Sequence, residues 1–188
     1  MGVARQWCGR LGKVDNCQVA VFAVLTDGQR HAPVDMRLYL PQRWIEEPKR
    51  CDRAGIPVSV RQLRSKAELA LQIVHAARAR GMRFAWVGVD GGYGKEPALL
   101  RALDDAGEVF VADVHSSQMV WTEPPGLQVP APKSPRGRQP IRLRAAAEPI
   151  TVEQLVSRFG AEDWTRCLLR DSTRGPLQVD IAHRRVWL

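Results

Sequence analysis

The sequence predicts an α/β core over residues 1–115, followed by a proline-rich basic linker over residues 116–150 and a partial β-rich segment over residues 151–188. Three observations predict this fold class. Two short apolar runs flank an Asp-Gly turn, an amphipathic helix begins at a capping box, and an apolar run without alternation precedes a second helix. The predicted order of elements in the core is β-β-α-β-α-β.

The first two strands are predicted at residues 17–25 and 33–40. The dipeptide Asp27-Gly28 separates them and is a strong hairpin signal, so the two strands should be antiparallel. In the second strand, Val34, Met36 and Leu38 alternate with polar residues. This alternation predicts that the apolar face is buried.

A helix is predicted to begin after Ser65, because Glu68 three residues later completes a capping box. Its apolar positions recur at helical spacing, and Gly81 suits the residue that follows a helix. The preceding stretch, residues 42–64, contains two prolines and many charges. We expect it to be a connecting excursion with at most one helical turn.

Residues 84–89 form a short apolar run without alternation, which predicts a central parallel strand covered on both faces. A helix follows from Pro97, with an apolar face at Leu99, Leu100 and Leu103, and residues 109–114 form the next strand. Together these elements are typical of a βαβ unit with parallel strands.

Beyond residue 114 the character of the sequence changes. Residues 123–149 contain seven prolines, which is typical of a linker. A short helix capped by Thr151 is predicted next, followed by strands at residues 165–170 and 177–187. Strand-like sequence continues to Leu188, so we expect the chain to be truncated inside a strand.

The net charge of +8 favours an acidic partner, and nucleic acid is the first candidate. No run of about eighteen apolar residues indicates a membrane partner. The cysteines at positions 8, 17, 51 and 167 form no C-x-x-C pair, so we expect reduced thiols in a cytoplasmic protein.

Asp90 is the best candidate for chemistry, because it directly follows a buried strand and is surrounded by glycines. Its carboxylate suits a hard cation such as Mg²⁺, whereas the alternative interpretation is a cap for the following loop. Asp113 and His115 are a second possible metal pair, although Asp113 can equally be a polar strand-end residue. The glycines match neither the G-x-G-x-x-G nor the P-loop pattern.

Two basic segments are candidates for contact with DNA phosphates. The alternative for both is a solvated basic surface. The first segment contains Lys133, Arg136, Arg138, Arg142 and Arg144, with no acidic residue among them, and the second, weaker segment contains Arg5 and Lys13.

Several blocks in order resemble the bacterial insertion-sequence transposases of the DDE superfamily. These blocks are GVARQWCG at 2–9, GKVDNCQ at 12–18, RLYLP at 37–41, KAELA at 66–70, WVGVDGGYG at 86–94, LRDSTRG at 169–175 and RRVWL at 184–188. The resemblance covers nearly the whole chain.

The resemblance implies an RNase-H-like fold whose first strand is missing here, with a partial, mostly β insertion at the C-terminal end. In the family, three carboxylates hold Mg²⁺ or Mn²⁺ for the cutting and joining of transposon ends. Asp90 matches the second carboxylate, while the first and third are expected outside this chain. We therefore expect a fragment that is inactive alone and poorly soluble.

Two other functions remain as alternatives. One is a non-catalytic protein that binds DNA or inhibits the full-length transposase, and the other is a small-molecule enzyme that uses the glycine-rich loop.

Overall fold

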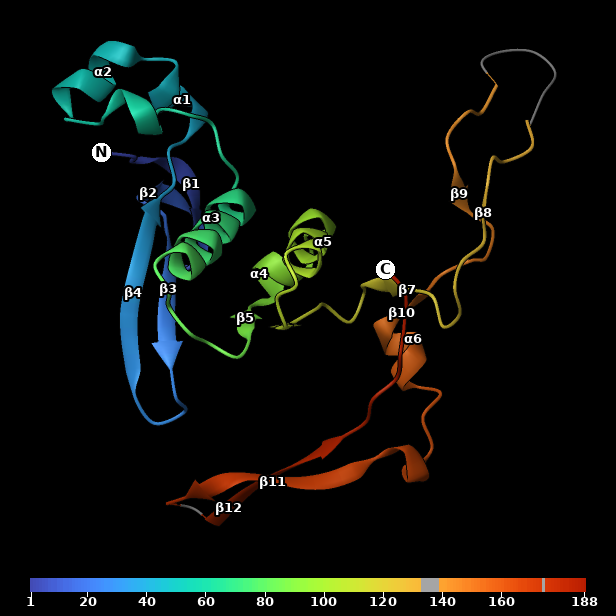
Figure 1. The fold of residues 1–188 in the computed structure, drawn as a ribbon. Coiled ribbons are helices and arrows are strands. Elements are labelled where there is room, and N and C mark those ends of the chain that lie inside the picture. The colour runs from blue at the N-terminus through green and yellow to red at the C-terminus, as the bar shows by residue number, and fades with distance from the viewer. Residues whose placement is uncertain (133–138, 174) are drawn as a thin grey trace. The chain divides into compact units, whose positions relative to one another are not determined.

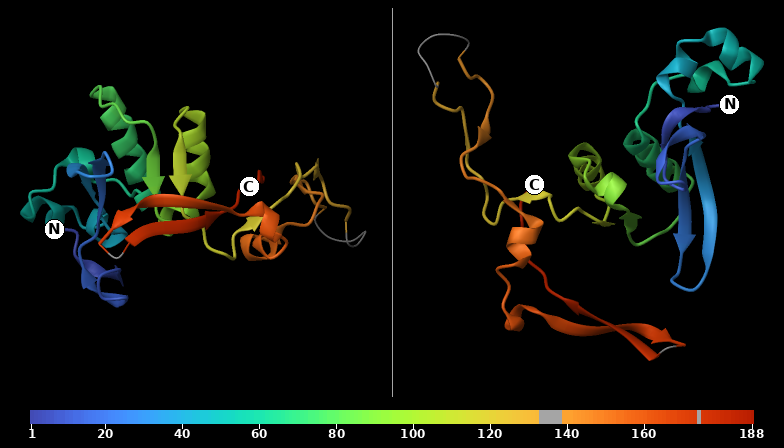
Figure 2. Two further views of the ribbon diagram at one scale, coloured as in Figure 1. Left: turned by 90° about the horizontal axis from the view of Figure 1, so that it is seen from below. Right: turned by 180° about the vertical axis from the view of Figure 1, so that it is seen from behind.

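The computed structural model describes residues 1–132, 139–173 and 175–188. The chain is mixed α/β and divides into two compact units, Met1–Asp113 and Val114–Leu188. Figures 1 and 2 show the elements of each unit, and the two units are considered separately below. All strands in the described residues pair as two-stranded sheets.

The N-terminal unit begins with a hairpin that the sequence did not predict. Strands β1 (Ala4–Cys8) and β2 (Lys13–Cys17) are antiparallel, with Gln6 opposite Asp15. Gly12 in the turn has φ 63°, a conformation that glycine adopts readily. The predicted strand at 17–25 is therefore divided, because β2 ends at Cys17 and β3 begins at Ala20.

The predicted Asp-Gly hairpin is confirmed. Strand β3 (Ala20–Thr26) pairs antiparallel with β4 (His31–Leu38), and Gly28 in the turn has φ 89°. The register shifts between Ala23 and Val24, which marks a bulge on the β4 side.

The prediction that the apolar face of the second strand is buried was wrong at Met36. Met36 lies opposite Phe22, and these side chains are 52% and 63% exposed. On the other face, the buried Val21 lies opposite Arg37. The charges on that face are compensated, because Asp35 forms ion pairs with Arg37 and with Arg80, which caps the C-terminal end of the helix Lys66–Ala79.

Residues 42–60 contain more helix than predicted. Helices α1 (Gln42–Ile45) and α2 (Pro48–Arg53) are followed by the 3₁₀ turn η1 (Val58–Val60). Their apolar side chains form a small core of Leu40, Trp44, Cys51 and Ile56. The Trp44 indole Nε1 donates to the Val3 carbonyl at 2.9 Å, which ties this core to the N-terminus.

Helix α3 (Lys66–Ala79) begins and ends as the sequence predicts. The Ser65 side chain accepts from the Glu68 backbone N–H, and the Glu68 carboxylate accepts from the Ser65 N–H. Gly81 has φ 75°. Leu69 and Ile73 on its apolar face pack with Val21 of β3, and Figure 1 shows α3 beside the β3–β4 hairpin.

The predicted parallel pair is confirmed. Strand β5 (Val87–Val89) pairs parallel with β6 (Phe110–Ala112), and helices α4 (Gly91–Gly94) and α5 (Pro97–Asp105) lie between them in the chain. Leu99, Leu100 and Leu103 of α5 are buried.

The prediction that residues 84–89 are covered on both faces was wrong. Trp86 is 53% exposed, and Val111 of the partner strand, which lies opposite Gly88, is 60% exposed. Within the described residues, helices pack against only one face of the β5–β6 sheet.

The C-terminal unit contains short ladders and one longer hairpin. Strand β7 (Met119–Val120) pairs with β10 (Ile150–Thr151), and β8 (Leu127–Gln128) pairs with β9 (Arg144–Ala145). The predicted Thr151 cap is confirmed at helix α6 (Val152–Val156), and η2 (Ala161–Asp163) follows. Strands β11 (Thr165–Ser172) and β12 (Gly175–Ile181) form an antiparallel hairpin.

All four cysteines are thiols, as their spacing predicted. Among the described residues, no helix combines the length and the apolar character that crossing a bilayer requires.

An ion pair joins Arg78, near the end of α3, to Glu108, which lies two residues before the start of β6. The Arg78 guanidinium donates twice to the Glu108 carboxylate, at 2.8 and 2.7 Å, and also lies over the Phe84 ring. These hydrogen bonds hold the pKa of Glu108 below its ordinary value and raise the pKa of Arg78. The pair connects elements that are distant in sequence.

We predict that Glu108→Gln lowers the melting temperature most at neutral pH. Because the pKa of Glu108 is lowered by folding, its contribution is complete above the unfolded value of about 4.3 and is lost as the pH falls through the folded value. Thermal melts at several pH values should show the gap between wild type and variant closing in acid. Glu123→Gln, an exposed carboxylate in the other unit, is the control, and a gap that stays constant with pH would contradict the prediction.

Candidate functional site

Asp90 lies where β5 passes into α4. Its backbone is extended, with φ −78° and ψ 175°, and it forms the N-cap of the helix. The carboxylate Oδ1 accepts from the Gly92 N–H at 2.9 Å, and the Asp90 carbonyl accepts from the Tyr93 and Gly94 N–H groups. The cap that the sequence offered as an alternative role is therefore present.

The Asp90 side chain is also exposed at the carboxyl end of a parallel strand, the edge at which α/β sheets present ligand-binding groups. The cap hydrogen bond uses one acceptor position of Oδ1. A carboxylate has about four acceptor positions, so the others remain available for a ligand. The cap and a ligand role are therefore compatible.

Asp113 is the neighbour of Asp90 across the sheet. Val89 lies opposite Ala112, and the Asp113 N–H donates to the Val89 carbonyl at 3.0 Å, so the parallel ladder continues by one step. Asp90 and Asp113 therefore follow paired positions at the same sheet edge, and both are exposed. The sequence pattern offered Asp113 only as one of two alternatives.

Gly94 holds α4 against this edge. A Cβ atom built at Gly94 would lie 1.9 Å from the Asp113 carbonyl oxygen, a backbone atom. Only glycine permits this close approach, which fixes the turn that carries Asp90. The pattern Asp-Gly-Gly-Tyr-Gly did not predict a helix, because glycine is a poor helix former.

Tyr93 connects the site to the core. It packs against the cluster of Val21, Leu69 and Ile73. Burial raises the pKa of the Tyr93 hydroxyl, and the nearby Asp90 carboxylate raises it further. The phenol is consequently protonated at neutral pH.

The donor chemistry of Asp90 fits a divalent cation, because carboxylate oxygen is the ligand that Mg²⁺ and Mn²⁺ prefer. Asp90 would supply one such ligand, and Asp113 lies beside it. Within the described ranges there is no cluster of three or more His, Cys, Asp or Glu side chains that could hold a metal ion.

The predicted DNA-contacting residues are distributed over both units. Lys133, Arg136 and Arg138 lie outside the described residues, whereas Arg142 and Arg144 are exposed in the C-terminal unit.

Arg5 and Lys13 are exposed in the β1–β2 hairpin. Arg5 lies opposite Asn16 and Lys13 lies opposite Cys8, so the two cations are on opposite faces of that ribbon. Lys13 also pairs with Asp15 at 3.3 Å.

Known protein families provide a match for most of the chain. A family model described as DDE superfamily endonuclease matches residues 1–176. Neither the curated proteins nor the solved structures contain a significant match.

We predict that Asp90→Ala destabilises the N-terminal unit by about 1 kcal/mol, the typical cost of losing a helix N-cap. Asp90→Asn should cost much less, because the amide oxygen still accepts from the Gly92 N–H. Urea unfolding of both variants measures the difference. Equal stability of the alanine and asparagine variants would show that the cap contributes nothing.

We predict that Gly94→Ala is more destabilising, by about 1–3 kcal/mol, because the added methyl group must displace backbone at Asp113. The matched control is Gly9→Ala, since a Cβ at Gly9 has no heavy atom within 4 Å. Urea denaturation again provides the readout. The close contact would be refuted if the two substitutions had the same effect.

Proposed function

Because the chain belongs to the DDE superfamily endonuclease family, we propose that it derives from a transposase that cuts and joins transposon ends by metal-dependent phosphodiester transfer. The observation that carries the proposal is the exposed Asp90 carboxylate at the carboxyl end of β5, within the segment that the family model matches. Endonucleases of this superfamily act on DNA and generally use divalent metal ions.

We propose that Asp90 is one metal ligand of this site and that Asp113 is the best second candidate among the described residues. A bound Mg²⁺ or Mn²⁺ supplies charge stabilisation for the phosphodiester and activation of the attacking oxygen. The role of this chain is to hold the Asp90 carboxylate. The Gly92 N–H orients one oxygen, and the packing of Tyr93 and Gly94 fixes the backbone around it.

We further propose that the chain alone does not cleave DNA. Two-metal phosphoryl transfer uses several carboxylates around metals about 4 Å apart. Removing one member of such a catalytic set typically costs orders of magnitude in rate. The absence of a cluster of three ligands from the described residues supports this proposal.

A non-catalytic role is the second candidate, and the charge favours it. The net charge of +8 and the exposed Arg142 and Arg144 suit contacts with DNA phosphates. In this role the chain would occupy transposon ends or associate with the full-length transposase, and would thereby inhibit transposition.

The experiment incubates the chain with labelled transposon-end DNA and either Mg²⁺ or Mn²⁺. We expect binding that weakens as salt rises, because phosphate contacts release counterions, and we expect no nicking. Asp90→Asn is the control variant, since it keeps the cap acceptor while removing the negative charge.

Two results would contradict the proposals. Nicking by the wild type that Asp90→Asn abolishes would show that the chain is itself a nuclease. A lack of DNA binding even at low salt would remove the case for either DNA-directed role.

A further inference from the structure

The β1–β2 hairpin has two unlike faces. One face, here called the outer face, consists of two cross-strand pairs, Arg5 with Asn16 and Trp7 with Val14. All four residues are exposed, and Trp7 leaves 57% of its surface to solvent. The opposite, inner face carries every partly buried residue of the two strands. The hairpin therefore holds an aromatic ring toward solvent on its fully exposed face.

The inner face and the base of the hairpin keep the outer face in place. The Gln6 side-chain Nε2 donates to the Cys17 carbonyl at 2.8 Å. At the base, the Trp44 indole donates to the carbonyl of Val3, one residue before β1. Neither hydrogen bond uses a side chain of the outer face. Trp7 can consequently contact a ligand without loss of the bonds that support the hairpin.

The outer face and the turn of the hairpin are positively charged. Arg5 lies on the outer face and Arg10 lies in the exposed turn. Among the residues that the structure describes, neither guanidinium forms an ion pair. Asp15, the one acid of the hairpin, lies on the inner face and pairs with Lys13 at 3.3 Å. Two uncompensated cations beside an exposed indole favour an anionic partner that also has flat apolar groups.

The size of the outer face favours a nucleic acid over a protein. Five residues at about 3.4 Å each make a hairpin about 17 Å long. Its outer face is several times smaller than the roughly 800 Å² that each partner buries in a stable protein interface. A nucleic acid needs less area, because one ring stacks a base and each cation contacts a phosphate.

We propose that the outer face binds an unpaired DNA base, which stacks on the Trp7 indole while Arg5 and Arg10 contact the neighbouring phosphates. The choice of DNA as the partner rests on the proposed function, but the contact uses none of the residues proposed to hold a metal ion. The ligand is an unpaired base because the faces of a base inside a duplex are covered by the adjacent bases of the stack. A base in a gap or at a strand end exposes such a face.

A second way of binding DNA sets the alternative that the experiment must separate. A two-stranded β-ribbon fits the major groove of an intact duplex. There the indole would meet the edges of bases, and Arg5 and Asn16 would donate hydrogen bonds to them. Groove binding therefore predicts no preference for unpaired bases, whereas stacking on Trp7 predicts a preference that depends on the base itself.

The test measures binding of the whole chain to fluorescently labelled DNA by anisotropy, without divalent cations. Three DNAs are compared: a short duplex, the same duplex with a gap that leaves adenines unpaired, and the gapped duplex with abasic sites in place of those adenines. We expect the adenine gap to bind roughly tenfold more tightly than the abasic gap, because stacking is lost with the base. The abasic DNA keeps its phosphates, so it is the matched control for charge.

Trp7→Ala should abolish the preference for adenine over abasic DNA, and Trp7→Phe should keep part of it, because phenylalanine still offers an aromatic face. Binding to the intact duplex should be unchanged in both variants, which shows that they are folded. Arg5→Ala should weaken binding to all three DNAs alike and reduce its salt dependence.

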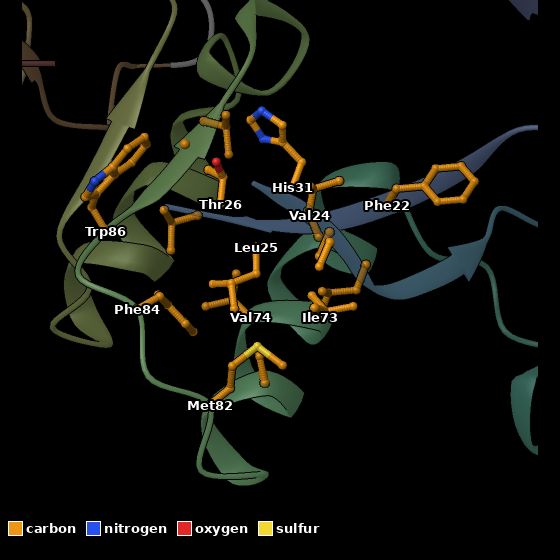
Figure 3. Close-up of a pocket in the computed structure, with 18 of the residues that line it drawn as sticks. Phe22, Val24, Leu25, Thr26, His31, Ile73, Val74, Met82, Phe84 and Trp86 are labelled. Atoms are coloured by element: carbon orange, nitrogen blue, oxygen red, sulfur yellow. The ribbon is translucent and has the colours of Figure 1, made fainter. Parts of the chain in front are cut away.

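The matched protein control is Trp86→Ala. Trp86 is 53% exposed and lies beside an apolar pocket of about 810 Å³, among side chains of β3 and α3 (Figure 3). It resembles Trp7 in exposure but lies outside the hairpin. We expect Trp86→Ala to keep the preference for unpaired adenines.

Each result supports or overturns the proposal. Equal binding to the adenine and abasic gaps, with binding to the duplex intact, would refute stacking and leave the proposed function standing. A preference that survives Trp7→Ala, or that Trp86→Ala removes as fully, would assign stacking to another residue. A lack of binding to all three DNAs at low salt would overturn this inference together with the DNA-directed function on which it rests.

Discussion

The packing of α3 on β3 is the interaction on which the N-terminal unit depends. In the part of the chain that the structure describes, no backbone ladder joins β3–β4 to β5–β6. Side-chain packing therefore holds these two strand pairs together. Val21, Leu69 and Ile73 form the centre of this core, and Tyr93 brings the segment after β5 against it. The position of Asp90 follows, because Asp90 and Tyr93 belong to the same tight helical turn.

Features with local signals were predictable from the sequence. The Asp27-Gly28 turn, the Ser65 capping box and the apolar face of α5 depend on residues a few positions apart, and the structure confirms them. The exposure of Met36 was not predictable from alternation, because the neighbours of a strand face come from elsewhere in the chain. At this strand the charged face is the one toward α3, where ion pairs to Asp35 compensate it.

The candidate site was predictable in part for the same reason. An aspartate after an apolar run marks the end of a strand, so the place of Asp90 followed from sequence. Its pairing position next to Asp113 depends on the β5–β6 register, and the close approach of Gly94 depends on backbone atoms remote in sequence. No sequence period encodes either contact. The basic segment could be recognised from composition, but three of its five cations, including Arg136, lie outside the described residues.

The close contact between Gly94 and the Asp113 carbonyl has a practical consequence for comparing sequences of this kind. An aspartate after an apolar strand is common, so its presence alone is a weak marker of a working site. A glycine four residues later reports on backbone spacing rather than on chemistry, because any side chain there would push α4 off the sheet edge. When copies of such a gene are sorted into those that can still hold the carboxylate and those that cannot, position 94 is a criterion separate from position 90.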